Sequence, residues 1–178
     1  MGAPGLVSGC LPMGRWTVTE AEAEALCATP DEARRREIWQ EWQQLTTSVR
    51  SCVGEVAACW LSGSFFTDKP IPADLDCVYF IDNALLANAR TDASRAAFLQ
   101  IVATKDEVKK QFGLRLDSFI VDWMPLPGVD AGTVFRQRNY LMPRGYWDDL
   151  WSRMRDPDPR LESVPRHGYL EVILDGYK

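Results

Sequence analysis

Two aspartates at positions i and i+2, preceded by a Gly-Ser turn, are the residues of this chain most suited to chemistry. If residues 74–81 form a strand, Asp74 and Asp76 lie on one face, because side chains alternate across a strand. Two carboxylates on one face repel each other unless a cation lies between them, and oxygen ligands of this kind suit Mg²⁺ or Mn²⁺. Just upstream, Gly63 and Ser64 form a turn whose backbone N–H groups can bind a phosphate. The combination predicts phosphoryl or nucleotidyl transfer.

A third carboxylate is expected from a neighbouring strand, because two-metal transfer also needs a ligand that helps to activate the attacking hydroxyl. The predicted strand Leu114–Trp123 contains Asp117 and Asp122. Their positions differ by an odd number, so they lie on opposite faces of that strand and only one of them can join the site. We favour Asp117, near the start of the strand, and keep Asp122 as the alternative.

These residues resemble the signature of the DNA polymerase β-like nucleotidyltransferase superfamily, in which a Gly-Ser turn precedes an Asp-hydrophobic-Asp strand. The two parts read Ser62-Gly63-Ser64 and Asp74-Leu75-Asp76-Cys77, with Ser62 and Cys77 at positions that are usually more apolar. The stretch Gly63–Pro70, with the sequence GSFFTDKP, is similar to a family of small uncharacterised bacterial and phage proteins. These proteins carry Gly-Ser-Phe-x-Thr-x-Lys-Pro before the Asp-x-Asp.

The resemblance implies an α/β (α+β) fold, a nucleotidyltransferase-like mixed β-sheet flanked by α-helices. A nucleoside triphosphate would bind with Mg²⁺ or Mn²⁺, and Gly63 and Ser64 would hold its β- and γ-phosphates. Lys69 is a further candidate for nucleotide binding, although a lysine before a proline in an exposed loop is more often simply solvated. The resemblance assigns the metals and the catalysis to three acids: Asp74, Asp76 and a third, for which we take Asp117. The superfamily's third acid lies between hydrophobic residues, a pattern that Asp122 fits better than Asp117.

The implied activity is transfer of a nucleoside monophosphate from a nucleoside triphosphate to an acceptor hydroxyl, with release of pyrophosphate. The acceptor would be an RNA, a protein or a small molecule. The alternative is a non-catalytic nucleotide- or partner-binding protein of the same fold, such as one component of a toxin–antitoxin or phage-defence pair. Fold resemblance alone does not decide between them.

Hydrophobic periodicity and turn residues predict a sheet with helices packed on it. The Gly- and Pro-rich residues 1–16 are expected to form an irregular arm, and residues 17–178 a single domain. A capping box at Thr17-x-x-Glu20 and a start signal at Thr29-Pro30 mark the first two helices. The expected helices span residues 17–27, 29–50, 92–112, 130–142 and 146–154, and the expected strands span residues 55–61, 74–81, 114–123 and 168–174.

Composition limits the class of protein. The 178 residues carry a formal net charge of −5, so nucleic acid would have to bind a local patch. The candidates for such a patch are Arg34–Arg36, Lys109-Lys110 and the arginines from Arg136 to Arg166, and solvated helix faces are the simpler interpretation of the first two. Five cysteines without C-x-x-C spacing indicate reduced thiols and a cytoplasmic protein, and no apolar run suggests a signal peptide or a membrane span. A single histidine, His167, leaves little basis for a histidine metal cluster or a serine triad.

The aromatic segment Tyr146–Trp151 has two interpretations. Its rings could stack on a nucleobase. Helical spacing of Trp147, Leu150 and Trp151 favours core packing instead. His167 is expected at the surface or at a cap.

Overall fold

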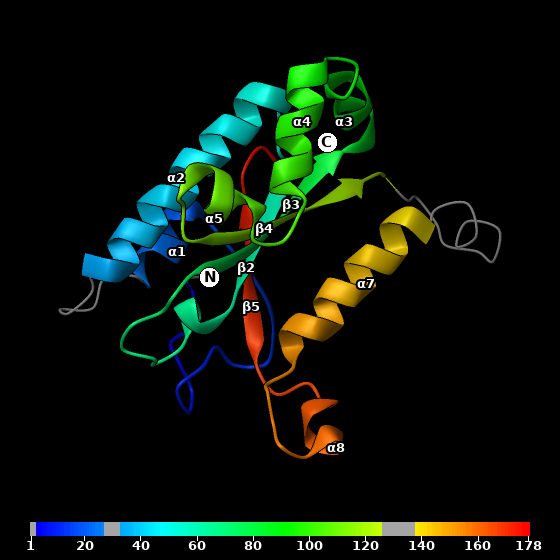
Figure 1. Cartoon of the computed structure of the whole chain (residues 1–178). Coiled ribbons are helices and arrows are strands. Elements are labelled where there is room, and N and C mark those ends of the chain that lie inside the picture. The colour runs from blue at the N-terminus through cyan, green and yellow to red at the C-terminus, as the bar shows by residue number, and fades with distance from the viewer. Residues whose placement is uncertain (1–2, 27–32, 126–137) are drawn as a thin grey trace.

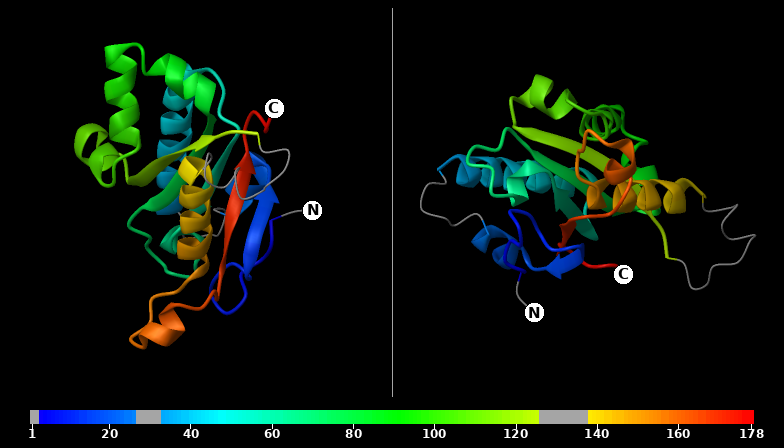
Figure 2. Two further views of the ribbon diagram at one scale, coloured as in Figure 1. Left: turned by 90° about the vertical axis from the view of Figure 1, so that its right-hand side faces the viewer. Right: turned by 90° about the horizontal axis from the view of Figure 1, so that it is seen from below.

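The computed structural model describes residues 3–26, 33–125 and 138–178, which form a five-stranded mixed sheet with helices on both faces (Figures 1 and 2). The α+β class expected from the sequence is confirmed. The strands are β1 (Gly14–Val18), β2 (Ala58–Ser62), β3 (Leu75–Asp82), β4 (Leu116–Trp123) and β5 (Gly168–Ile173). The helices are α1 (Glu20–Ala25), α2 (Ala33–Val53), α3 (Asn83–Ala89), α4 (Ala93–Val102), α5 (Glu107–Phe112), α7 (Arg138–Ser152), α8 (Pro159–Glu162) and the 3₁₀ turn η1 (Ser64–Phe66).

The strands are ordered β1-β5-β2-β3-β4 across the sheet. β1 runs parallel to β5, and β3 runs parallel to β4, whereas β2 is antiparallel to both of its neighbours. The end of β2 therefore lies at the same edge of the sheet as the starts of β3 and β4. That edge receives the Gly-Ser turn from one strand and the acidic residues from the other two.

Each face of the sheet has its own apolar core. On one face, Trp39 and Trp42 of α2 pack with Leu61, Tyr79 and residues of α3, α4 and α5. On the other face, a smaller cluster around Trp60 lies beneath α7, the helix that stands alone on that side in Figure 1. Because this second face is less completely covered, polar residues at the edge of the sheet stay accessible there.

The predicted boundary between the irregular arm and the first helix, at residues 16 and 17, is wrong. Residues 14–18 form β1, so a strand begins inside the expected arm and occupies the expected cap at Thr17. The capping box is built two residues later, where Glu22 N–H donates to Thr19 Oγ1 at 3.2 Å and Thr19 N–H donates to Glu22 Oε2 at 2.8 Å. Two overlapping Thr-x-x-Glu patterns are present, and pairing of β1 with β5 decides between them.

Other differences are small. α3 is an additional helix, and it follows β3 directly because Asp82 Oδ1 accepts a hydrogen bond from Ala84 N–H at 2.7 Å and caps the helix. The predicted stop at Gly113 is confirmed by its left-handed φ of 72°. The predicted helix start at Thr29-Pro30 and most of the expected helix 130–142 lie outside the described residues, and α7 runs through Pro143 without the expected break.

Four cysteines of the described chain are buried and free: Cys10, Cys52, Cys59 and Cys77. None of the described helices combines the length and the apolar character that crossing a membrane requires.

Candidate functional site

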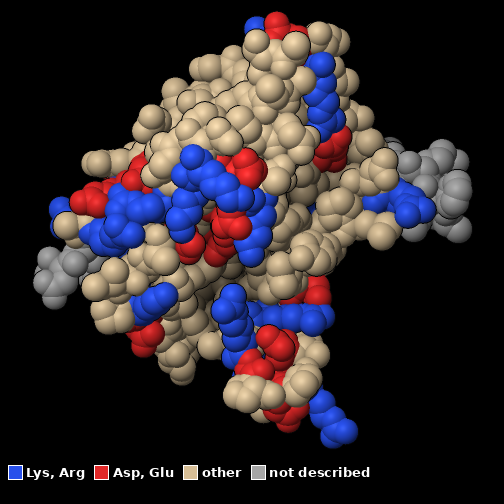
Figure 3. Space-filling model, viewed as in Figure 1, with Lys and Arg blue, Asp and Glu red and all other residues tan. Residues whose placement is uncertain are grey.

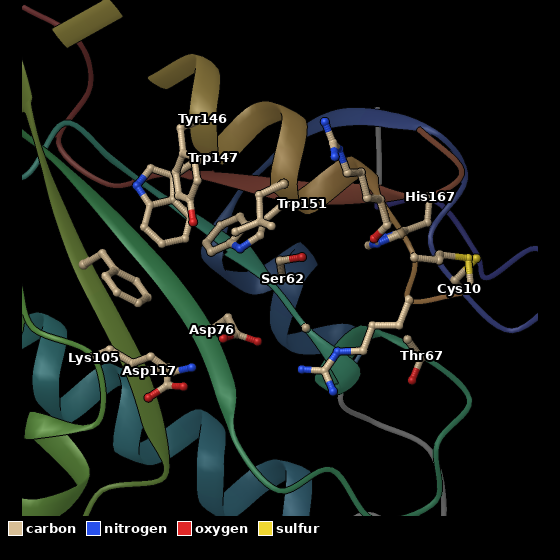
Figure 4. Close-up of a pocket in the computed structure, with 16 residues that line it drawn as sticks. Cys10, Ser62, Thr67, Asp76, Lys105, Asp117, Tyr146, Trp147, Trp151 and His167 are labelled. Carbon is tan, nitrogen blue, oxygen red and sulfur yellow. The ribbon is translucent and has the colours of Figure 1, made fainter. Parts of the chain in front are cut away.

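The start of β3 and the start of β4 bring two acidic side chains together. Asp76 and Asp117 are register partners on these parallel strands, so they lie side by side on the same face of the sheet, the face beneath α7. Ser62, the last residue of β2, is the register partner of Asp76 on its other side. The sheet thus places the Gly-Ser turn beside both carboxylates, and Figure 4 shows Asp76 and Asp117 facing the same cavity.

Gly63 makes the closest approach to this acidic pair. Its φ of +89° lies in the left-handed region that favours glycine. A Cβ at this position would overlap Asp76 Oδ2. Both the backbone conformation and the space therefore require glycine here, and this requirement ties the Gly-Ser turn to the first acidic strand.

Asp76 carries an electrostatic cost. Its pKa is raised to about 6, chiefly by burial and further by repulsion from Asp74 and Asp117. Lys105 and Arg155 oppose the shift from a distance. Within the described chain, the Asp76 carboxylate accepts no hydrogen bond and forms no ion pair. No described group therefore neutralises its negative charge by direct contact.

Asp117 fixes the turn that carries Lys105. Its Oδ1 accepts a hydrogen bond from Asp106 N–H at 3.2 Å, and Asp106 has a positive φ of 62°, which is uncommon for a residue other than glycine. This turn between α4 and α5 places Lys105 at the cleft. Sequence reasoning missed Lys105, because a single lysine in a turn between helices carries no signal of its own.

Several expected site residues lie away from the cleft. Asp74 precedes β3 and is near enough to raise the pKa of Asp76, but it does not line the cavity. Ser64 and Lys69 are not among the lining residues, and Lys69 is exposed. Asp122 lies near the far end of β4, where it pairs with Arg90 at 3.3 Å. The described geometry thus joins Asp117, and not Asp122, to Asp76.

A buried arginine holds the loop after the Gly-Ser turn. Arg35 donates from Nε to the carbonyl of Phe65 at 2.9 Å, and from Nη2 to the carbonyls of Thr67 and Lys69, each at 2.8 Å. Its side chain is only 6% exposed, so the interpretation of Arg34–Arg36 as a uniformly solvated helix face is wrong at this position. An arginine that binds three loop carbonyls fixes the shape of the segment that leads into β3.

The cleft above the acidic pair has a volume of about 670 Å³. Figure 4 shows Tyr146, Trp147 and Trp151 projecting into it from α7, across from Asp76 and Asp117. The expected core packing holds for Trp151, which is buried, and in part for Trp147, which packs against the cluster around Trp60; it is wrong for Leu150, which is exposed. The cleft is lined by Cys10, Ser62, Gly63, Thr67, Asp76, Lys105, Asp117, Phe119, Tyr146, Trp147, Leu150, Trp151, Arg153, Met154, Arg155 and His167.

His167 closes one end of the cleft as a structural residue. Its Nδ1 lies 2.9 Å from the carbonyl of Gly168, and its Nε2 lies 2.7 Å from the carbonyl of Arg153. Both ring nitrogens are thus engaged with backbone, which links β5 to the end of α7. The expected capping role fits this geometry.

Several basic residues elsewhere on the surface form ion pairs. On the face in Figure 3, basic and acidic side chains lie interleaved. Arg115 donates to Glu41 and to Glu37, and Lys110 pairs with Glu107 at 2.9 Å. Lysine and arginine on this face are therefore partly neutralised, whereas no described acid lies within ion-pair distance of Lys105 or Arg155 at the cleft.

Comparison with known proteins gives a family and no function. Residues 6–173 match the model of DUF6932, a family of unknown function. The chain belongs to DUF6932. The matched range contains all five strands and every residue that lines the cleft. No curated protein and no solved structure matches this DUF6932 chain.

The acidic pair fits a hard divalent cation in part. Asp76 and Asp117 offer only oxygen atoms, and their mutual repulsion would be relieved by a cation between them. The described residues contain no cluster of three or more potential metal ligands. Mg²⁺ suits such a site, because it commonly takes one or two carboxylates and completes its shell with water and substrate phosphates.

Proposed function

We propose that this DUF6932 protein is a metal-dependent nucleotidyltransferase, which moves a nucleoside monophosphate from a nucleoside triphosphate to an acceptor hydroxyl and releases pyrophosphate. The observation that carries the proposal is the pair of register partners Asp76 and Asp117 beside the glycine turn at Gly63, in which the Asp76 carboxylate has no hydrogen-bond or ion-pair partner among the described residues. A fold rarely gathers like charges at a cleft without a ligand that needs them. The resemblance of the Gly-Ser and Asp-x-Asp motifs to the polymerase β-like superfamily supports the same proposal.

The acidic pair and two cations of the cleft have roles in this proposal. Asp76 and Asp117 would hold Mg²⁺, with Asp74 close by to strengthen the negative field. Bound there, the metal supplies neutralisation of the charge that builds on the phosphoryl oxygens. Lys105 and Arg155 supply positive charge at the same cleft and orient the phosphates. Gly63 lets a phosphate approach the backbone, because no side chain stands in the way.

A second candidate function is nucleotide binding without turnover, as in one component of a toxin–antitoxin or phage-defence pair. The position of Asp74 favours it, because this acid does not line the cleft with the other two. Two carboxylates are enough to hold one metal with a nucleotide, whereas two-metal transfer needs more ligands.

The test is label transfer from each of four nucleoside triphosphates carrying ³²P at the α-phosphate. The protein is incubated with Mg²⁺ or Mn²⁺ and with total RNA, protein lysate or small-molecule alcohols as acceptors. We expect labelled acceptor with the wild type and with Asp122→Asn, and none with Asp76→Asn or Asp117→Asn. Metal-dependent nucleotide binding without any label transfer would favour the second candidate, and the absence of both would contradict each proposal.

A further inference from the structure

The aromatic wall of the cleft has the features of a binding surface. Phe119 of β4 and Trp147 of α7 pack with their ring centroids 4.4 Å apart, and Tyr146 meets Trp147 edge-on at 5.0 Å. Tyr146 remains 57% exposed, and its neighbour Leu150 is 41% exposed. Aromatic rings that stay exposed beside a cleft mark a ligand surface more often than a packing defect.

The charges of the same cleft restrict what that ligand can be. Lys105 and Arg155 line it and have no acidic partner within ion-pair distance in the described chain. They lie near enough to Asp76 to lower its pKa against the effect of burial. A ligand that fits must therefore present a flat apolar ring toward α7 and a multiply charged anion toward the cations and the acidic pair.

We propose that Phe119, Tyr146 and Trp147 form a nucleobase-stacking subsite, which positions the base of a nucleoside triphosphate while its phosphates lie at Lys105, Arg155 and the acidic pair. This inference rests on the proposed function, and it adds how the protein would recognise the base of the nucleoside triphosphate. Stacking uses the π-face that every base has, so it binds nucleotides without reading the base edge.

The composition of the wall defines this selectivity. Phe119, Leu150 and Met154 offer no strong hydrogen bond, so the polar groups of the wall are the Tyr146 hydroxyl and the indole N–H groups of Trp147 and Trp151. A site built in this way prefers purines over pyrimidines by a few-fold, because the larger ring stacks over more area. It does not select one base strongly.

The experiment is isothermal titration calorimetry of the full chain with Mg²⁺ and either ATP or inorganic tripolyphosphate, which has the charges without the base. We expect ATP to bind the wild type about tenfold more tightly than tripolyphosphate. Trp147→Leu and Tyr146→Leu should each remove most of that advantage and leave tripolyphosphate binding unchanged. Tyr146 is exposed, so its variant tests the subsite even if loss of Trp147 disturbs folding.

Trp123→Leu is the matched control. Trp123 also lies on β4 and packs in the cluster beneath α7, but it stacks near Tyr177 at 5.4 Å and does not line the cleft. This variant should bind ATP as the wild type does.

Three outcomes overturn the inference, and they can be told apart. Equal affinity of the wild type for ATP and tripolyphosphate, or unchanged ATP binding in both wall variants, removes the stacking subsite and leaves the proposed function standing. A hundredfold preference for one base contradicts selection by stacking alone. Failure of the wild type to bind either compound contradicts the proposed function itself, and the subsite with it.

Discussion

Two carboxylates on the same face of the sheet are treated in opposite ways by the rest of the chain. Glu171 of β5 is 7% exposed, and it accepts hydrogen bonds from Thr17 Oγ1 at 2.9 Å, Trp60 Nε1 at 3.0 Å and Tyr177 Oη at 2.8 Å. Arg15 Nε lies 3.5 Å from its second oxygen. Asp76 of β3, by contrast, accepts no hydrogen bond within the described chain and faces Asp74 and Asp117.

The difference separates a charge that the fold uses from one that the fold does not need. Glu171 links β1, β2 and the segment after β5 through donors that satisfy it completely, so removing it would leave those donors unpaired. Asp76 has only repulsive neighbours at close range, so the fold is less stable with its charge than without it. A carboxylate that costs stability where it stands is a candidate for a role in ligand binding.

The largest effect is expected from removing the satisfied carboxylate. Glu171→Ala should lower the free energy of unfolding by about 3 kcal/mol, because a buried donor set and a partly buried arginine lose their acceptor. Urea denaturation followed by tryptophan fluorescence measures this. Glu171→Gln keeps one acceptor oxygen and should lose less. A loss below about 1 kcal/mol for the alanine variant would show that the network is not structural.

The next effect concerns the glycine against Asp76. Gly63→Ala should cost about 2 kcal/mol, because it combines a left-handed backbone with an overlap between the new Cβ and the carboxylate. Gly54→Ala is the control, since Gly54 has φ +95° but a Cβ added there would meet no atom of a non-adjacent residue within 4 Å. The difference between the two variants in the free energy of unfolding, measured by urea denaturation, gives the cost of the overlap between the new Cβ and Asp76. Equal losses of stability in the two variants would mean that the Asp76 side chain moves away at no cost.

A smaller effect of opposite sign is expected at Asp76 itself. Its pKa is raised on folding from 3.8 to about 6, so the folded state binds more protons than the unfolded state between these values. The free energy of unfolding therefore falls as pH rises through this window and stays lower above it. A rise from 3.8 to about 6 corresponds to about 3 kcal/mol, and water around this partly exposed carboxylate screens part of it. Asp76→Asn, which has no charge to titrate, should therefore be about 1–2 kcal/mol more stable than the wild type at pH 8.

This gain should disappear below pH 4, where the wild-type carboxyl is protonated. Asp74→Asn should move the window to lower pH, because Asp74 contributes to the shift. Thermal denaturation between pH 4 and pH 8 follows both variants. An Asp76→Asn variant that is less stable than the wild type at pH 8 would contradict the contrast with Glu171.

The smallest effect is expected at the acid left outside the site. Asp122→Asn removes an exposed ion pair with Arg90 and should change stability by no more than about 0.5 kcal/mol. It should also leave intact any rise in melting temperature that Mg²⁺ produces. Asp117→Asn should abolish that rise, and differential scanning fluorimetry with and without Mg²⁺ compares the two. If Asp122→Asn abolished the rise and Asp117→Asn kept it, the metal site would have to be placed on the other face of the sheet.

The sequence predicted the acidic side of the candidate site where it depends on local pattern. Alternation placed Asp117 and Asp122 on opposite faces, and the structure places Asp117 beside Asp76. The strands around these acids were also predicted to within a few residues, because apolar alternation and bounding turns are local signals.

The rest depends on contacts between residues that are far apart in the chain. β1 is short and half polar, and it is a strand because β5 pairs with it, so local patterns favoured a helix cap instead. The burial of Arg35 depends on the loop carbonyls that it binds, and the placement of Lys105 depends on the Asp117 hydrogen bond. Neither residue differs by type or spacing from an ordinary surface cation.

The position of β5 also affects how the chain is made. β5 lies between β1 and β2. Thr17 of β1 donates a hydrogen bond to Glu171 of β5, which is synthesised 154 residues later. At a synthesis rate of about 5–20 residues per second, that delay is roughly 10–30 s, during which β1 and the open edge of β2 have no partner. A nascent chain that lacks residues 168–173 leaves both strands free to pair with other proteins. The addition of β5 to the sheet is therefore the step at which a chaperone would have most to protect.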